Sequence, residues 1–453
     1  MFSSSLFLLV MTVLLRPVKA ARATGFRISS HSPAPLRAPS PNIQSSHVLN
    51  LSRKTRAYAG SASYLKAIRQ NYQVQGVYSF TPLTSEFDGQ EFITSIGVGS
   101  NTFQVLVDTG SSDTWLAETG FQCLDQYSGV AEPEDYCMLG PTYDISGTFR
   151  AISNENFNIT YGDGEFLTGT FGLEEVSIGG ITVISQQIAV VNSAAWNGDG
   201  ISSGLLGLAF PSLTSAYAGT DPNVDSGSNK IEYNPIFTNM YEEGNVPPLF
   251  SLAIERGSFG GYLALGGLPP VIFDSVFASS PIQILTMQNV AGSGMTGEYS
   301  FYAITIGGLV YNGSQSTKFS QGNWPSLLAA PKKPSQMQVI VDSGTTLIYL
   351  PTGIANAVNA LFNPPAVFDN YKGAYTVACT AAVPSLGIEI GGVTFYINPV
   401  DMILAAGDGT CITGVDDAGL LEECHRRLRC WGKSDEACCT GLLRERGLRW
   451  QTN

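Results

Sequence analysis

Short apolar runs that alternate with polar residues recur along the chain and are separated by glycine-rich turns. Residues 91–98 read EFITSIGV and residues 157–170 read FNITYGDGEFLTGT, with alternate positions apolar in both. A period of two is typical of half-buried β-strands, and Asp163-Gly164 favours the tight turn of a hairpin. In the two lobes, short helices are expected at the start of residues 235–268 and over residues 353–362. The pattern therefore predicts an all-β chain.

One apolar-to-polar pattern occurs twice. Residues 103–116 read FQVLVDTGSSDTWL and residues 337–350 read MQVIVDSGTTLIYL. In each copy an apolar run ends in an aspartate, Asp108 or Asp342, which enters a glycine turn. The corresponding turn residues are Thr109, Gly110 and Ser111 in the first copy and Ser343, Gly344 and Thr345 in the second. One Asp-Thr-Gly arises by chance in about one chain in ten of this length, but two copies with matching flanks predict two related lobes.

Two aspartates presented in this way suit acid–base chemistry. The hydroxyls and amides of each turn can hydrogen-bond the carboxylate, so neither carboxylate needs a cationic partner. If the halves pack about a two-fold axis, the two carboxylates meet, cannot both ionise cheaply and share one proton. A water between them can lose a proton to one carboxylate while the other polarises a carbonyl. The pattern indicates amide hydrolysis without a covalent intermediate.

These motifs and their flanks resemble those of the pepsin-type aspartic endopeptidases, over roughly residues 58–415. The resemblance implies a bilobal, pepsin-like acid protease fold with a catalytic cleft between two related β lobes. It implies that Asp108 and Asp342 are catalytic, that a flap covers a polypeptide substrate, and that no metal or cofactor is needed. It assigns substrate contacts to Tyr161, Gly162, Asp163, Gly110, Gly344 and Thr345, and supporting roles to Thr109, Ser111, Trp115 and Ser343.

Other hydrolase classes are disfavoured by the positions of the histidines. His31, His47 and His425 lie outside both lobes, and no Cys or His spacing suits zinc. The serines of the two motifs have no nearby histidine in the sequence, which disfavours a catalytic triad.

The charge of the chain is divided unevenly. Residues 1–85 contain ten Lys or Arg and no Asp or Glu, whereas the whole chain carries a net charge of −13. Nucleic-acid binding is one alternative for such a basic segment, but interleaved aromatic residues are lacking and the acidic remainder would repel a polyanion. We therefore expect no nucleic-acid partner.

The N-terminal residues are predicted to direct and control the enzyme. Residues 1–23 have the apolar core and small residues of a secretory signal. No later apolar run approaches the ~20 residues that span a bilayer, so we expect a secreted or vacuolar monomer without a membrane anchor. Residues 24–76, helical in period over 65–72, resemble an inhibitory prosegment whose Lys66 or Lys54 pairs with the catalytic carboxylates until acid weakens the pairing. A disordered basic linker is the alternative.

The repeat sets the remaining boundaries. We expect an N-terminal catalytic lobe over residues 77–270 and a C-terminal lobe over residues 271–415. Residues 203–213, SGLLGLAFPSL, are expected to form a strand that packs behind Asp108. The eight cysteines fit an oxidising compartment, and the resemblance pairs Cys123 with Cys137 and Cys379 with Cys411. Glycosylation sequons lie at Asn50, Asn158 and Asn312, and the nearby flap disfavours Asn158.

Composition changes abruptly at Asp416. Residues 416–453 hold half of the eight cysteines: Cys424, Cys430, Cys438 and Cys439. A second apolar pair ending in glycine, like Leu205-Leu206-Gly207, is missing there, so the C-terminal lobe is expected to be incomplete and the loop around Asp342 unsupported. A change of reading frame near Gly419 is our hypothesis. The alternative function is therefore a pepsin-fold protein that binds peptide or protein without cleaving it.

Overall fold

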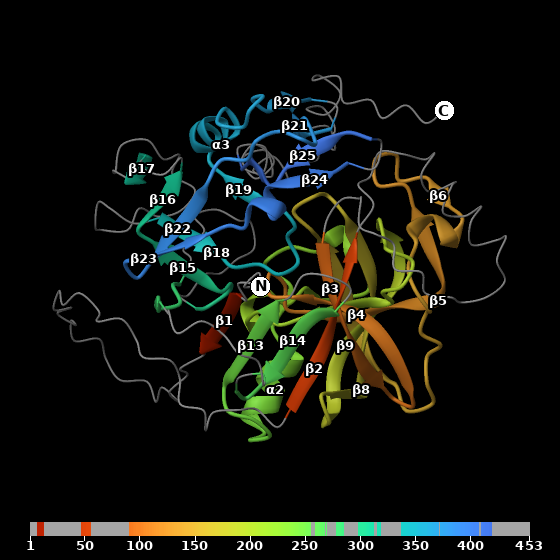
Figure 1. Ribbon diagram of the computed structural model, residues 1–453. Coiled ribbons are helices and arrows are strands. Elements are labelled where there is room, and N and C mark those ends of the chain that lie inside the picture. The colour runs from red at the N-terminus through yellow and green to blue at the C-terminus, as the bar shows by residue number, and fades with distance from the viewer. Residues whose placement is uncertain are drawn as a thin grey trace.

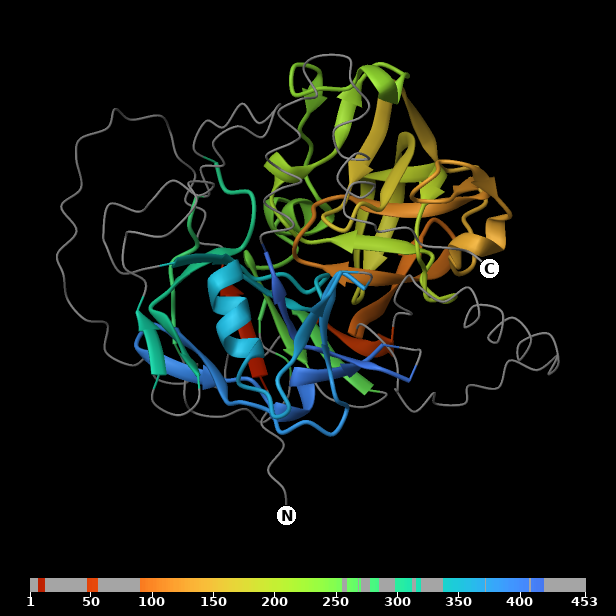
Figure 2. The ribbon, with the colours of Figure 1, turned by 90° about the horizontal axis from the view of Figure 1, so that it is seen from above.

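The computed structural model describes residues 7–12, 47–55, 90–254, 259–267, 269, 278–284, 298–311, 315–318, 337–370, 372–406 and 409–418. Strands of the N-terminal half, in orange to green, lie beside strands of the C-terminal half, in cyan to blue (Figure 1). In the view from above, most of the orange and yellow strands lie on the opposite side from the cyan and blue strands (Figure 2). This arrangement agrees with the expected all-β, bilobal fold.

The N-terminal half is organised as one sheet of 14 strands. In spatial order these are β1 (Phe7–Thr12), β13 (Leu249–Ile254), β14 (Phe259–Leu265), β2 (His47–Thr55), β3 (Gln90–Val98), β4 (Asn101–Asp108), β10 (Gly204–Gly207), β5 (Thr114–Leu124), β9 (Ile181–Ala195), β8 (Phe166–Ile178), β7 (Arg150–Thr160), β11 (Ala216–Ala218) and β12 (Lys230–Ile231), with β6 (Ala131–Glu132) beside β5. The predicted hairpin over residues 157–170 is confirmed as β7 and β8. The predicted short helix is α2 (Ile236–Glu242), and the hairpin β13–β14 follows it.

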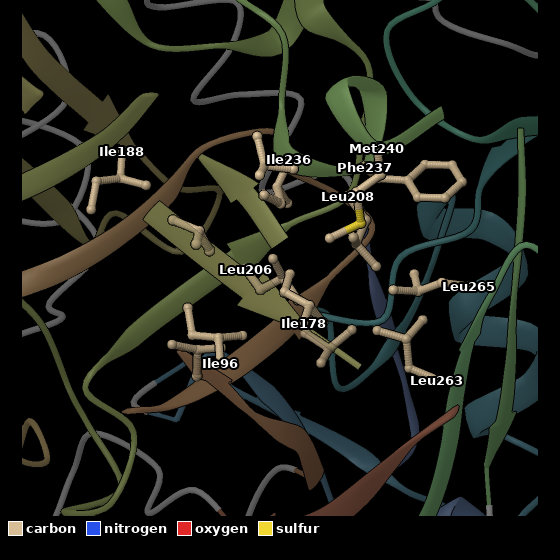
Figure 3. Close-up of a cluster of buried hydrophobic side chains, with 14 of the residues drawn as sticks. Ile96, Ile178, Ile188, Leu206, Leu208, Ile236, Phe237, Met240, Leu263 and Leu265 are labelled. Atoms are coloured by element: carbon tan, nitrogen blue, oxygen red, sulfur yellow. The ribbon is translucent and has the colours of Figure 1, made fainter. Parts of the chain in front are cut away.

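Alternating side chains of these strands fill a buried apolar core. Figure 3 shows Ile96 of β3, Ile178 of β8 and Leu206 of β10 gathered with side chains from α2 and β14. Leu206 is fully buried. Burial of one such side chain stabilises the fold by about 1.5–3 kcal/mol, so this core anchors β10.

Strand β10 lies directly behind the first aspartate, as expected. It runs parallel to β4, with Gly207 beside Asp108, and antiparallel to β5. The amide of Leu208 donates to the carbonyl of Asp108 at 2.8 Å. A Cβ on Gly207 would lie 2.4 Å from the carbonyl carbon of Ser112, so only glycine allows this close approach.

The C-terminal half is built from smaller sheets. They are β15 (Ala303–Ile306) with β18 (Met337–Ile340); β17 (Gln315–Lys318), β16 (Gly308–Tyr311), β22 (Leu386–Ile390) and β23 (Val393–Tyr396); β19 (Ile348–Leu350) with β26 (Val415–Asp417); and β20 (Val367–Asp369), β21 (Ala374–Val377), β25 (Cys411–Thr413) and β24 (Ile403–Ala405). The predicted helix near residues 353–362 is α3 (Thr352–Asn359).

Two strands come from the segments predicted to be signal and prosegment. β1 pairs with β13, and β2 lies between β14 and β3 with Lys54 opposite Glu91 in register. Lys66 and the helical stretch 65–72 lie outside the described residues. The processing of both segments stays a prediction.

Both predicted disulfides are present. Cys123 and Cys137 are joined with their Cα atoms 5.8 Å apart, and Cys379 and Cys411 with theirs 5.2 Å apart. The four cysteines of residues 416–453 lie outside the described residues.

The side chain of Asn158 donates to the carbonyl of Pro222 and to Asp225, so a glycan there would displace both contacts.

Asp416 gives the C-terminal lobe a pH-dependent stability. Its side chain is 2% exposed on β26, and burial raises its pKa from 3.8 to about 6. Because the folded pKa is raised, the proton stabilises the fold at low pH, and this stability is lost as the pH rises from about 4 to about 6. We expect Asp416→Asn to remove ~2–3 kcal/mol of this pH dependence, measured by denaturant unfolding at pH 3.5 and pH 7. An unchanged difference between the two pH values would contradict this role.

Candidate active site

The two aspartate turns meet between the lobes through reciprocal hydrogen bonds. Thr109 Oγ1 donates to the carbonyl of Val341 at 2.9 Å and accepts from the amide of Ser343 at 2.9 Å. Ser343 Oγ donates to the carbonyl of Val107 at 2.8 Å and accepts from the amide of Thr109 at 3.1 Å. Each turn therefore supplies one hydroxyl that bridges to the backbone of the other turn.

Each carboxyl group is held by its own turn. The amide of Gly110 donates to Asp108 Oδ1 at 2.7 Å, and Ser111 Oγ donates to Asp108 Oδ2. In the second copy, the amide of Gly344 donates to Asp342 Oδ1 at 2.8 Å and Thr345 Oγ1 donates to Asp342 Oδ2 at 2.7 Å. The repeat seen in the sequence is thus a repeat of hydrogen bonds.

The two carboxyl groups face each other across the glycines. A Cβ on Gly110 would lie 2.4 Å from Asp342 Oδ2, and one on Gly344 would lie 2.6 Å from Asp108 Oδ1. Burial, followed by the charge of Asp342, raises the pKa of Asp108 well above its usual range. Proximity of two carboxyls favours one shared proton, and this sharing stays a prediction.

The hairpin turn between β7 and β8 carries Tyr161, Gly162 and Asp163. Trp115 Nε1 donates to the Tyr161 hydroxyl at 2.9 Å. Burial and the charge of Asp108 raise the pKa of Tyr161, so the phenol stays protonated and its O–H remains available as a donor. Gly162 and Asp163 are exposed at the tip.

Sequence reasoning missed the residues that hold this turn. Trp196 packs edge-on against both Trp115 and Tyr161, with ring centroids 5.2 Å and 5.6 Å away. The amide of Asn197 donates to Glu165 Oε1 at 2.9 Å, and Gln126 Nε2 donates to the Asp163 carbonyl at 3.0 Å. Only the tertiary fold reveals these contacts, because they join segments that are distant in the sequence.

The buried carboxyl group of Asp113 was also missed. Tyr233 donates its hydroxyl to Asp113 Oδ1 at 2.7 Å, and the amide of Ser215 donates to both carboxyl oxygens. Burial raises the pKa of Asp113. Asp113 follows the first motif directly, so its place in FQVLVDTGSSDTWL was the available signal.

The part of the chain that the structure describes holds neither a metal-binding cluster nor a membrane-spanning helix. No group of three or more His, Cys, Asp or Glu side chains in that part of the chain could hold a metal ion. None of the helices in the described ranges is long and apolar enough to cross a membrane.

The fold and the two facing carboxyl groups are those of an aspartic protease. Comparison with known proteins gives the same class. The profile of the family described as "Eukaryotic aspartyl protease" matches residues 91–425, and so includes the first residues of the segment 416–453. A protein of Aspergillus fumigatus named "Probable aspartic-type endopeptidase" is 40% identical over 412 residues, covering 89% of this chain and 87% of that protein. Rhizopuspepsin-4 of Rhizopus niveus is 30% identical over 339 residues, covering 74% of this chain and 71% of the relative.

The fold has a solved counterpart as well. The crystal structure of the aspartic proteinase from Irpex lacteus matches with a TM-score of 0.52 and 23% identity, covering 73% of this chain and 84% of that one. The chain belongs to the eukaryotic aspartyl protease family and is an aspartic endopeptidase.

The contact between Gln126 and Asp163 predicts a role in positioning the flap turn. Gln126→Ala removes one hydrogen bond to its tip, worth about 1 kcal/mol. We expect KM for a peptide substrate to rise about fivefold with kcat nearly unchanged, because the bond holds the tip and not the reacting atoms. Steady-state kinetics check this, with Gln122→Ala, a nearby exposed residue, as the control. A loss of kcat alone would contradict a positioning role.

Proposed function

We propose that this protein hydrolyses internal peptide bonds at acid pH through a water activated jointly by Asp108 and Asp342. The observation that carries the proposal is the approach of each carboxyl group to the glycine of the opposite turn, which leaves room for no larger residue. Two carboxyl groups at this distance hold one proton between them below neutral pH. That state contains both the base and the acid that the reaction needs.

In the proposed reaction the ionised carboxylate takes a proton from the water as its oxygen attacks the peptide carbonyl. The protonated carboxyl donates a hydrogen bond to the carbonyl oxygen, where negative charge develops. Because the two carboxyl groups titrate as one coupled pair, one of them holds the shared proton and acts as the acid while the other acts as the base. No covalent bond forms between enzyme and substrate.

We assign substrate binding to the two turns and to the flap. Gly162 and Asp163 are exposed at the flap tip, where backbone groups would pair with an extended peptide, as an added strand does. Gly110 and Gly344 lie directly beside the carboxyl groups, and Thr345 donates a hydrogen bond to Asp342. Thr109, Ser111, Trp115 and Ser343 hold these groups in place through the hydrogen bonds described above.

Family membership and both aspartates argue against the alternative of a non-catalytic binding protein. The remaining features are proposals from the sequence: an N-terminal lobe over 77–270, a C-terminal lobe over 271–415, a segment outside the family pattern over 416–453, secretion or vacuolar delivery after removal of 1–23, and a monomeric enzyme. The position of β2 in the sheet supports inhibition by residues 24–76, because a prosegment paired in this way is part of the fold.

The dyad is tested by removing one carboxyl group at a time. We expect Asp108→Asn and Asp342→Asn each to lower hydrolysis of an unfolded protein near pH 4 by about 10³-fold, because each leaves one carboxyl without its partner. Circular dichroism should show that the fold is retained. Asp144→Asn, an exposed carboxyl elsewhere, serves as the control. Appreciable turnover by either dyad variant would refute the assignment.

Acid should trigger release of the N-terminal segment. Residues 24–85 contain no Asp or Glu and are attracted to an acidic body, and protonation of that body weakens the attraction. Carboxylates whose pKa is lowered by such pairing lose the resulting stability as pH falls through the folded value. We expect the purified proform to release the segment faster at pH 4 than at pH 7, followed by electrophoresis. Equal rates would refute the trigger.

A further inference from the structure

A tyrosine from the C-terminal half is buried in the apolar core of the N-terminal half. Tyr302 directly precedes β15, which pairs with β18 among the strands of the C-terminal half. Its ring nevertheless belongs to the core that anchors β10, with ring centroids 4.9 Å from Phe210 and 5.4 Å from Phe250. Only 2% of Tyr302 is exposed. The side chain therefore crosses from one half of the molecule into the other.

The hydroxyl of Tyr302 makes a hydrogen bond inside this core. It donates to the carbonyl of Leu208 at 2.7 Å, and Leu208 lies in the same cluster of buried side chains (Figure 3). Burial raises the pKa of Tyr302 well above its usual range, so the hydroxyl stays protonated and remains a donor. Because an apolar ring alone would fill the core, the hydroxyl contributes something that packing does not.

This hydrogen bond is one link in a path that joins the two aspartate segments. On one side, the amide of Leu208 donates to the carbonyl of Asp108 at 2.8 Å. On the other side, the carbonyl of Tyr302 accepts from the amide of Val341 at 3.0 Å, and Val341 directly precedes Asp342. A continuous series of hydrogen bonds thus connects the backbone at one aspartate with the backbone at the other.

Neighbouring residues strengthen the same connection. The amide of Phe210 donates to the carbonyl of Ser300 at 3.3 Å, and Ser212 Oγ donates to the carbonyl of Tyr299 at 2.7 Å. Phe210 is held in turn by the first aspartate segment, because Ser112 Oγ donates to its carbonyl at 2.6 Å. The segment that leaves β10 therefore contacts the first aspartate turn on one side and the segment that enters β15 on the other.

Two connections join the halves of the molecule at the dyad. The hydroxyls of Thr109 and Ser343 join the two turns directly, and the path through Tyr302 joins them by way of the core. Two bodies held at one point can rotate about it, whereas two separate connections fix their orientation. The turn of Asp342 has the greater need of this restraint, because residues 341–346 are half-buried or exposed.

We propose that Tyr302 is a positioning residue for peptide-bond hydrolysis: its hydroxyl fixes the relative orientation of the two lobes and, through it, the separation of the Asp108 and Asp342 carboxyl groups. This inference rests on the proposed function of that pair. Tyr302 acts through backbone hydrogen bonds and not on the substrate. Because a misplacement of about 1 Å can cost about 10²-fold in rate, one bond in the core can determine kcat.

Tyr302→Phe tests this role, because it removes the hydroxyl and keeps the ring. We expect kcat for a peptide substrate to fall about tenfold, with KM changed by less than about twofold. The two apparent pKa values that bound the pH profile of kcat/KM should move closer together, since carboxyl groups held less closely interact more weakly. Wild-type kcat, or an unchanged separation of these two pKa values, overturns the proposal.

The matched control is Tyr375→Phe. Tyr375 is also buried, and its hydroxyl donates to Asn356 Oδ1 at 2.9 Å, with both residues in the C-terminal half. The control variant loses a hydrogen bond of the same kind that does not join the two halves. We expect it to keep the wild-type kcat and pH profile. An equal loss of kcat in the control would show a general effect on stability and would overturn the proposal.

Amide hydrogen exchange of the full-length protein follows the same connection without reference to activity. In Tyr302→Phe we expect the amides of Leu208 and Val341 to lose protection about tenfold relative to both wild type and Tyr375→Phe. Unchanged protection of both amides overturns the proposal. Failure here is distinct from failure of the dyad: if Asp108→Asn and Asp342→Asn are inactive while Tyr302→Phe behaves as wild type, the dyad stands and the role of Tyr302 falls.

Discussion

The reciprocal hydrogen bonds between the turns of Thr109 and Ser343 are the constraint on which the site depends. Two carboxyl groups that share a proton repel each other when both ionise, so the dyad itself holds the lobes together only while that proton is present. Each bridging hydroxyl donates to a backbone carbonyl of the opposite segment and accepts from a backbone amide of that same segment. Because both bridges join backbone to side chain, the distance between the carboxyl groups is fixed by the fold rather than by their charge.

The support behind the two carboxyl groups is unequal. Asp108 is 5% exposed and lies on a loop held by β10, inside a sheet whose apolar core is complete. Asp342 projects from a loop with far less cover. Burial is the largest cause of the raised pKa of Asp108, so the packing behind this residue increases its affinity for a proton.

The internal repeat made most of the site predictable from sequence. The residues that directly follow each aspartate in the sequence supply its hydroxyl and glycine neighbours. The hairpin at Asp163-Gly164 is likewise predicted by its own turn residues. Contacts such as Gln126 with Asp163, or Tyr233 with Asp113, could not be predicted, since they depend on how distant segments pack. The pairing of β1 and β2 with the main sheet was missed for the same reason, because both segments were classed by composition alone.

Asp108, Asp113 and Asp416 link the stability of the fold to the pH of its surroundings. All three carboxyl groups are buried, and burial raises the pKa of each. Partly compensating, hydrogen bonds lower the pKa of Asp125 and Glu174. Burial makes the ionised form of each of these carboxyl groups less stable in the folded chain, so folding free energy is lost as the pH rises through each folded pKa. Packing in the interior thus ties the stability of the folded chain to an acidic environment.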